Sequence, residues 1–188
     1  MNLMISETSL QPTPAATGAT HADVAVDILS YAIGECALDR VLVARSANGV
    51  CAILIGADHD ELGADLAVPQ ATLVTNEALV HADLAKVIRF VDKPAEGLHL
   101  TLDMRGTPLH RRVWEKLRSI PVGRTVTYME LAHWISPLLS ARVIAGACAA
   151  NPIALAIPCH RVVRADGDLA DYPWGIERKR ELIRKEMA

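Results

Sequence analysis

The sequence predicts an α+β fold in two parts, an α/β unit followed by a mostly helical unit. Short apolar runs with hairpin signals occupy the first part, whereas helical spacing with capping residues dominates the second. Charge divides at about the same place. Residues 1–100 carry 5 Lys or Arg and 13 Asp or Glu, and residues 101–188 carry 14 and 9. We therefore expect a leader at 1–22, an α/β domain at 23–104 and a helical domain at 105–188.

Alternating apolar runs define the first domain. The leader before it is rich in Ser, Thr, Ala and Pro and is expected to be disordered. Val24–Ile33 has apolar residues at helical spacing and predicts a short helix. Arg40–Arg45 and Gly49–Gly56 predict two strands, because the Asn48-Gly49 pair between them is a strong hairpin signal. Further elements are expected as helices at Asp58–Ala67 and Glu77–Val91 and a strand at Leu98–Met104.

The second domain opens with a helix-start signal. Thr107 can cap free backbone N–H groups, and Pro108 suits the first position of a helix. Helices are expected at Pro108–Ile120, Tyr128–Ile135, Leu139–Ala150 and Ile176–Met187. A Ser136-Pro137 turn joins the middle two, which is typical of a helix-turn-helix, and the pair lies in the basic half of the chain.

The segment Ser140–Ala150 consists almost entirely of small residues. Small side chains let another backbone approach closely. This favours either tight packing against a neighbouring helix or contact with a ligand as large as DNA. Arg142 is its only charged residue and lies near its N-terminal end, where recognition helices contact DNA.

Cys159 is the candidate nucleophile. It follows an apolar run, Ile153–Ile157, which we expect to be a buried strand or extended segment. A thiol attacks as its thiolate, so it needs a nearby base or positive charge, and His160 and Arg161 are of those two types. Because neighbours in sequence usually point apart, a water molecule is the expected link between the thiol and the imidazole.

Composition limits which cellular compartments and which cofactors are expected. No apolar run reaches membrane length, and the first basic residue is Arg40, so neither a membrane partner nor a signal or transit peptide is expected. The four cysteines form no CxxC pair, and the early candidates His21, Cys36, Cys51 and His59 lack ligand spacing. We expect a cytoplasmic protein with free thiols and without metal or cofactor. The net charge of −3 alone argues against nucleic acid, but the basic second half removes that objection.

Several motifs together resemble one family. Pro158-Cys159-His160-Arg161-Val162 is similar to the PCHRV active-site signature of O6-alkylguanine-DNA alkyltransferases. Further matches in the family's order are Gly106-Thr107-Pro108, Ile120-Pro121 with Gly123 and Tyr128, Arg142, Ala149-Ala150-Asn151-Pro152, and Tyr172 with Trp174-Gly175. The likeness covers residues 25–188 and is greatest to the methyltransferase half of bacterial Ada proteins. The zinc-binding cysteines of Ada's regulatory half are missing from this sequence, so no transcription activator is expected.

The resemblance implies a fold, a partner and a reaction. It implies a ribonuclease H-like domain followed by a winged-helix-like domain that carries the helix-turn-helix. The partner is double-stranded DNA containing O6-alkylguanine, contacted through the minor groove, with the damaged base rotated into a pocket. A methyl or larger alkyl group passes from guanine O6, and by extension from thymine O4, to Cys159. The thioether is not cleaved again, so each molecule, expected to be a monomer, reacts once.

The resemblance also implies residue roles. Cys159 attacks the alkyl carbon, and a relay runs from a glutamate, by position Glu186, through His160 and a water to the thiol. Asn151 is the hinge, and Tyr128 rotates the nucleotide and donates a hydrogen bond to the leaving guanine. The remaining substrate-binding residues are Arg142 as the finger that replaces the flipped base, Arg161, Val162, Tyr172 and Pro173. Arg161 is expected to bond internally, and the Cys159 and Val162 carbonyls to accept the guanine amine.

Two positions depart from the family pattern. Asp171 stands where the family usually has Gly or Asn, and an acid close to DNA should weaken binding. Pro173 stands where the family usually has Arg or Ser, whose backbone N–H donates to guanine O6. Proline has no N–H, so this donor is missing and slower repair is expected.

Three other functions compete with this one. A relative that recognises alkylated bases without repairing them would lack the nucleophile, whereas Cys159 is present. A sequence-specific helix-turn-helix regulator needs base-reading side chains, and the helix around Arg142 offers few. A Cys-His hydrolase would need a substrate cleft and repeated turnover.

Overall fold

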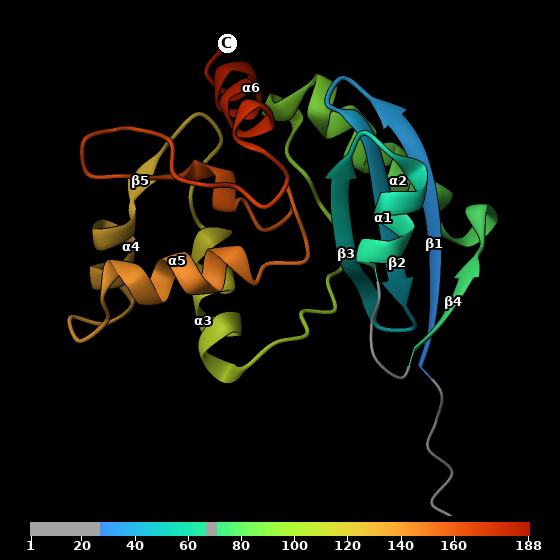
Figure 1. Ribbon diagram of the computed structural model, residues 1–188, viewed down its shortest axis with the longest axis horizontal. Coiled ribbons are helices and arrows are strands. Elements are labelled where there is room, and N and C mark those ends of the chain that lie inside the picture. Colours follow the sequence, from blue (N-terminus) through green and yellow to red (C-terminus); the bar gives the residue numbers. More distant parts are fainter. Residues whose placement is uncertain (1–26, 67–70) are drawn as a thin grey trace, which may run out of the picture.

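A computed structural model describes residues 27–66 and 71–188 (Figure 1). Strands β1 (Asp27–Cys36), β2 (Asp39–Ser46), β3 (Gly49–Gly56) and β4 (Ala71–Thr75) form a sheet in the order β3-β2-β1-β4. The pairs β1/β2 and β2/β3 are antiparallel, whereas β1 and β4 are parallel. The predicted hairpin of β2 and β3 is confirmed, and so is the α+β class.

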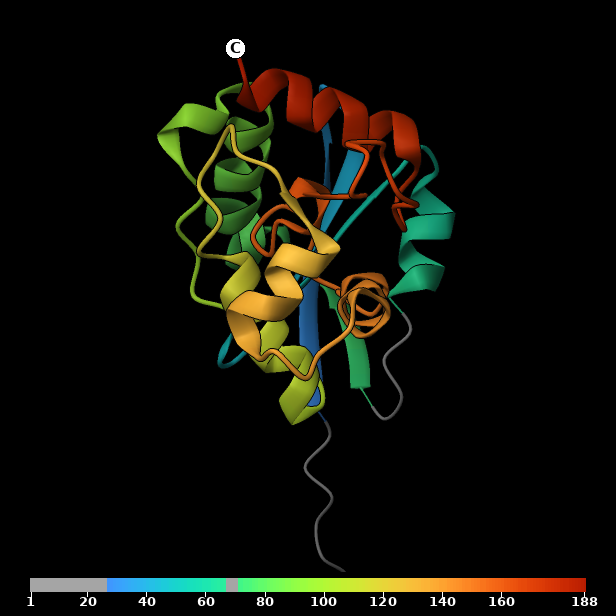
Figure 2. The same cartoon turned by 90° about the vertical axis from the view of Figure 1, so that its left-hand side faces the viewer.

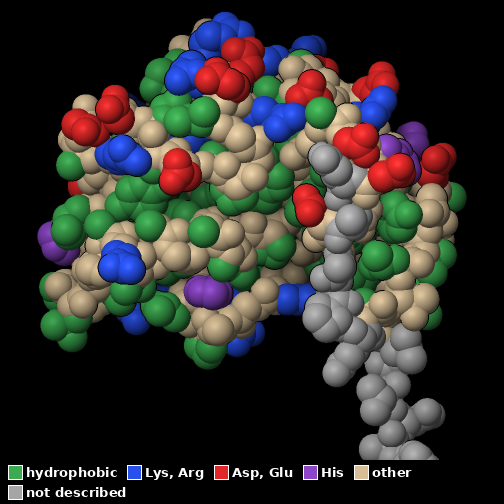
Figure 3. Space-filling model, in the orientation of Figure 1, with side chains coloured by type: hydrophobic (Ala, Val, Ile, Leu, Met, Phe, Trp, Pro, Cys, Tyr) green, Lys and Arg blue, Asp and Glu red, His purple; other side chains and the backbone are tan. Residues whose placement is uncertain are grey.

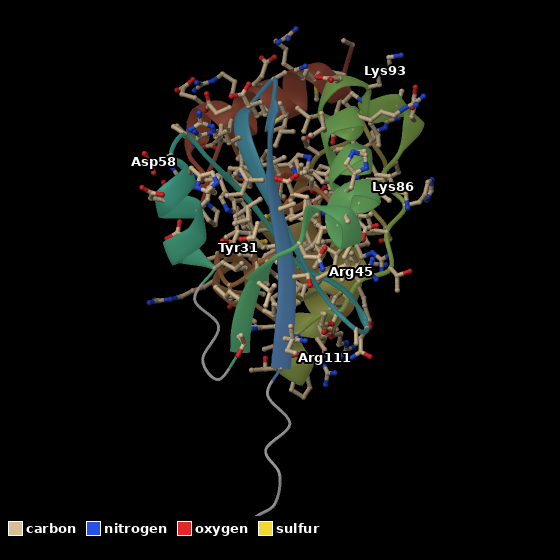
Figure 4. The ribbon with its side chains drawn as sticks, turned by 90° about the vertical axis from the view of Figure 1, so that its right-hand side faces the viewer. Tyr31, Arg45, Asp58, Lys86, Lys93 and Arg111 are labelled. Atoms are coloured by element: carbon tan, nitrogen blue, oxygen red, sulfur yellow. The ribbon has the colours of Figure 1, made fainter. Side chains whose placement is uncertain are left out.

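Helices cover both faces of this sheet (Figure 4). The helix α1 (His59–Asp65), which begins beside Asp58, packs Leu62 against one face. The longer helix α2 (Glu77–Asp92), which carries Lys86, packs Val80, Val87 and Phe90 against the other face and leads into the short turn η1 (Pro94–Glu96). Both helices lie where the sequence predicts them, although Ala67 falls outside the described residues.

The helix predicted at Val24–Ile33 is wrong in the part that the structure describes. β1 runs through it, between β2 and β4, as an interior strand of the sheet. A strand covered on both faces carries apolar residues on both sides, so the alternation that marks a strand is lost from the sequence. The edge strand β4 was not predicted, because Ala71–Thr75 is largely exposed and has no alternating pattern.

The free edge of β3 is covered by two passing segments. The Val50 N–H donates to the Thr101 carbonyl at 2.9 Å, and the Asp103 N–H donates to the Val50 carbonyl. The strand predicted at Leu98–Met104 is therefore only an extended segment with one bridge, at Leu102. Ile53 makes a second parallel bridge, to Ile153, which ties the sheet to the segment before Cys159.

The second part is built from helices and a two-stranded parallel ladder. Helices α3 (Pro108–Leu117), α4 (Tyr128–Ile135), α5 (Ala141–Ala149) and α6 (Ile176–Glu186) lie close to the predicted positions. The Thr107 side chain accepts a hydrogen bond from the His110 N–H, which confirms the predicted cap. Strand β5 (Val126–Thr127) pairs with β6 (Val162–Val163), and the short helical turn η2 (Cys159–Arg161) comes directly before β6.

Helices α3, α4 and α5 pack together and set the position of α5. The Trp114 indole N–H of α3 donates to the Ala147 carbonyl of α5 at 2.8 Å. Helix α6 lies across the top of this part of the molecule and packs on η2 (Figure 2). None of the helices in the described ranges is both long and apolar enough to span a membrane.

Candidate active site

The segment that bridges to the sheet edge at Ile153 leads directly to Cys159, the first residue of η2. After the bridge at Ile153 the backbone turns through Leu155, which has a positive φ of 66°. The Ile153–Ile157 run is almost entirely buried, as expected, but only Ile153 pairs like a strand. Cys159 itself is 2% exposed, so its thiol meets solvent only through the cavity described below.

Asn151 holds this loop in shape. Its side-chain N–H group donates to the Ile157 carbonyl at 2.9 Å and to Cys159 Sγ at 3.3 Å, while its oxygen accepts from the Ile153 N–H. The amide is therefore fully used inside the loop, and it both positions the sulfur and offers it a donor.

His160 is oriented by Glu186. The ring is completely buried, and its Nε2 lies 2.9 Å from Glu186 Oε1. Burial alone would raise the pKa of Glu186, but hydrogen bonds from His160 and Arg161 outweigh it and lower the pKa to about 2. An ionised carboxylate only accepts, so Nε2 carries the proton and Nδ1 keeps its lone pair. Within the described residues Nδ1 has no partner.

Burial sets the resting protonation of the site. It lowers the pKa of His160, against the opposing effect of Glu186, so the imidazole is neutral and can take a proton. It also raises the pKa of Cys159 to about 11, although the Asn151 hydrogen bond and the charge of Lys179 act in the other direction. At neutral pH the thiol is therefore protonated and needs a base, which the free His160 nitrogen can provide.

Arg161 is engaged inside the protein. Its guanidinium donates two hydrogen bonds of 2.8 Å to Glu186 and one to the Ile120 carbonyl, and the residue is 6% exposed. It does not line the cavity beside Cys159. These bonds agree with its expected role in holding the active-site loop, and a direct contact with substrate stays a prediction.

A cavity of about 690 Å³ opens onto the thiol. Its walls come from α4, α5, the end of β6 and the loop before α6. The lining residues are Tyr128, Ala141, Arg142, Ala145, Cys148, Ala149, Cys159, Arg164, Ala170, Asp171, Tyr172 and Pro173. Uncharged side chains predominate on this side of the molecule, with both basic and acidic side chains among them (Figure 3).

The exposed face of α5 borders the cavity and is made of small residues. Arg142, Ala145, Gly146 and Ala149 are exposed, whereas Ile144 and other residues on the opposite face are buried. A side chain at Gly146 would meet nothing within 4 Å. Packing therefore does not require a glycine at position 146, and the small side chains leave this exposed face low enough for a close neighbour.

The tyrosines of the site differ in their surroundings. Tyr128 begins α4 and is half-buried on the cavity wall, where burial raises the pKa of its hydroxyl and keeps it a proton donor at neutral pH. Tyr172 is almost fully buried, and its ring meets His160 edge-on. Asp171 and Pro173 flank it, and both are exposed and line the cavity.

Val162 does not line the cavity with its side chain. It is buried at the start of β6, and its carbonyl accepts a hydrogen bond of 2.7 Å from Lys179 Nζ. Sequence reasoning missed this lysine, although its position three and seven residues before Leu182 and Glu186 places all three on one face of α6. It also missed that the Gly123 N–H approaches Glu186 Oε2 at 3.4 Å.

Within residues 27–66 and 71–188 no group of three or more His, Cys, Asp or Glu residues could hold a metal ion. His21, which was considered as an early ligand candidate, lies outside these ranges.

The fold and the site define an α+β protein with a buried cysteine, a carboxylate-oriented histidine and an open cavity between them and a small-sided helix. Comparison with known proteins identifies the family. Residues 108–188 match the 6-O-methylguanine DNA methyltransferase DNA-binding domain. The methylated-DNA–protein-cysteine methyltransferase of Candida albicans is 34% identical over 170 residues, which cover 84% of this chain and 96% of that protein. The chain belongs to the methylated-DNA–protein-cysteine methyltransferase family, as its motifs suggested.

Two further relatives show how far the likeness extends. The bifunctional transcriptional activator/DNA repair enzyme Ada of Escherichia coli is 44% identical over 158 residues, which cover 83% of this chain but 45% of that protein. The chain thus spans less than half the length of this relative. The crystal structure of Mycobacterium tuberculosis OGT in complex with DNA superposes with a TM-score of 0.67 at 27% identity, over 84% of this chain and 92% of that one.

Proposed function

We propose that the protein repairs DNA by moving a methyl or larger alkyl group from guanine O6 to its own Cys159. The observation that carries this is a buried thiol at the inner end of a cavity that is bordered by the exposed small-residue face of α5. The names of the relatives supply the substrate class. A target base must leave the duplex to reach so buried a sulfur.

The reaction is an in-line displacement at the alkyl carbon. His160 Nδ1 removes the thiol proton through a water, Sγ forms a bond to the carbon, and the O6–carbon bond breaks with its electron pair going to guanine. Tyr128 donates to the departing base. A thioether is not cleaved by ordinary amino-acid side chains, so one molecule repairs one lesion. O4-alkylthymine presents the same type of alkyl–oxygen bond and is a second substrate to test.

DNA binding is assigned to α4 and α5 as a helix-turn-helix. Arg142, at the exposed N-terminal end of α5, is the residue proposed to fill the gap left by the rotated base. We place this unit in a winged-helix-like domain at residues 105–188 and name the preceding domain ribonuclease H-like. The strand order β3-β2-β1-β4, in which β1 and β4 are parallel, supports the ribonuclease H-like description of the preceding domain. A monomer working in the cytoplasm remains our expectation.

Titration of damaged DNA tests this function. A duplex with one O6-methylguanine inside a restriction site, which the lesion blocks, is incubated with increasing amounts of protein, and restored cleavage is scored. We expect cleavage to rise linearly and to stop at one duplex per active protein molecule. Continued repair beyond that ratio would indicate a turnover enzyme, and binding without restored cleavage would indicate a damage sensor.

A further inference from the structure

A buried lysine lies close to the reactive cysteine. Lys179, on α6, is 0% exposed, and its Nζ donates to the Val162 carbonyl at 2.7 Å and to the Ala170 carbonyl at 3.3 Å. Val162 follows η2, and Ala170 belongs to the loop before α6 that lines the cavity. One ammonium group therefore connects the Cys159 turn with the Asp171–Pro173 loop.

This charge lacks a carboxylate partner among the described residues, unlike the other buried cation of the site. Arg161 is neutralised by Glu186, whereas Lys179 makes hydrogen bonds only to carbonyl oxygens. A buried charge without a counterion is costly. The buried ammonium group of Lys179 is stabilised when a negative charge forms nearby, and a thiolate at Cys159 would be such a charge.

We propose that Lys179 is a positioning residue for the alkyl transfer, which holds both cavity loops through its hydrogen bonds and stabilises the Cys159 thiolate with its positive charge. This inference rests on the proposed function, but its test uses the thiol alone and needs no DNA.

The surroundings of the thiol agree with this role. The titratable and charged groups that line the cavity with it are Tyr128 of α4, Cys148 of α5, Arg164 after β6, and Asp171 and Tyr172 of the loop before α6. Lys179 of α6 acts on the thiol by its charge. Burial lowers the pKa of Lys179, whereas the proximity of Cys159, Cys148 and Asp171 raises it and that of Arg164 lowers it. Lys179 lowers the pKa of the Cys159 thiol in return, because the two charges attract.

The test is the pH profile of Cys159 alkylation by iodoacetamide, followed by mass spectrometry of the Cys159 peptide. In Lys179→Met the chain keeps a similar length but no charge, and in Lys179→Gln it keeps a hydrogen-bond donor without charge. We expect both variants to shift the midpoint upward by about one pH unit, which corresponds to a tenfold loss of thiolate at a given pH. Arg180→Met, an exposed neighbour on α6, is the matched control and should leave the midpoint unchanged.

A merely structural lysine would give a different result. Both variants would then react more slowly at every pH with the wild-type midpoint, and this would overturn the proposal. A third variant, Lys179→Arg, keeps the positive charge and the hydrogen-bond donors, and it keeps the proposal testable if the uncharged variants do not fold. Its midpoint should match that of the wild type, and a midpoint shifted upward by about one pH unit would also refute the proposal.

Discussion

His160 is held so that one ring nitrogen faces a carboxylate, while the other has no hydrogen-bond partner among the described residues. The Nε2–Glu186 contact of 2.9 Å fixes the tautomer, and the second carboxylate oxygen accepts from Arg161. A single buried carboxylate thus orients the proposed base and anchors the active-site turn. This makes Glu186 the residue at which stability and reactivity depend on the same contacts.

Glu186→Gln should therefore lower both the reactivity and the stability of the protein. We expect methyl transfer to slow roughly a hundredfold, since the tautomer is no longer fixed, and the free energy of unfolding to fall by about 3 kcal/mol, since the Arg161 charge stays buried and unpaired. Single-turnover kinetics and urea unfolding measure these effects. Glu181→Gln, which removes an exposed pair with Arg184, is the control and should change neither.

The pH dependence of this stability has a defined sign. The pKa of Glu186 is lowered from 4.5 to about 2, so its stabilising effect is complete above about pH 4.5 and is lost as the pH falls toward 2. Wild type should lose stability in this window more steeply than Glu186→Gln. Parallel unfolding curves for the two proteins from pH 5 to 2 would contradict the assignment.

Pro173 offers a second test at the level of one residue. It lines the cavity and has no N–H to donate to a leaving oxygen. Pro173→Ser restores a donor, and because such a bond contributes about 1 to 1.5 kcal/mol, we expect methyl transfer to become about tenfold faster. Single-turnover rates on methylated DNA check this, and equal rates would show that the missing donor is unimportant.

At the scale of elements, α5 has an exposed face of small residues, on which packing does not require the glycine at position 146. Gly146→Leu should leave the fold intact and even raise the melting temperature slightly, because glycine weakens a helix. The same substitution should weaken binding to O6-methylguanine DNA at least tenfold by blocking close approach. Ala85→Leu on the exposed face of α2 is the control for added bulk. Unchanged DNA affinity in Gly146→Leu would remove α5 from the interface.

Elements with local signals were predictable from the sequence. The Asn48-Gly49 hairpin and the Thr107 cap lie as predicted because turn and cap preferences are local properties of the chain. β1 was mistaken for a helix because both its faces are covered, and the weak pairing at Leu102 depends on a partner strand far away in sequence. In the site, Glu186 was named from its position in the family pattern, whereas the burial of Lys179 depends on how α6 packs on η2.

At the scale of the whole molecule, the proposed function and the charge division together predict that the second part contacts DNA. Arg142→Ala should weaken DNA binding and reduce the salt dependence of the affinity by about one unit of slope. Glu77→Gln combined with Asp92→Asn on α2 should change the affinity by less than about twofold, because α2 takes no part in the cavity. A larger effect from the α2 pair than from Arg142 would contradict this division.

The central claim is that the alkyl group ends on Cys159, and intact mass spectrometry tests it most directly. The protein is incubated with an oligonucleotide duplex containing O6-methylguanine, and its mass is measured before and after, with peptide mapping of the product. We predict a gain of a single methyl group, located on Cys159 and lost in Cys159→Ala, with guanine restored in the DNA. An unchanged mass with the lesion intact and the DNA still bound, or a methyl group on another residue, would contradict the account.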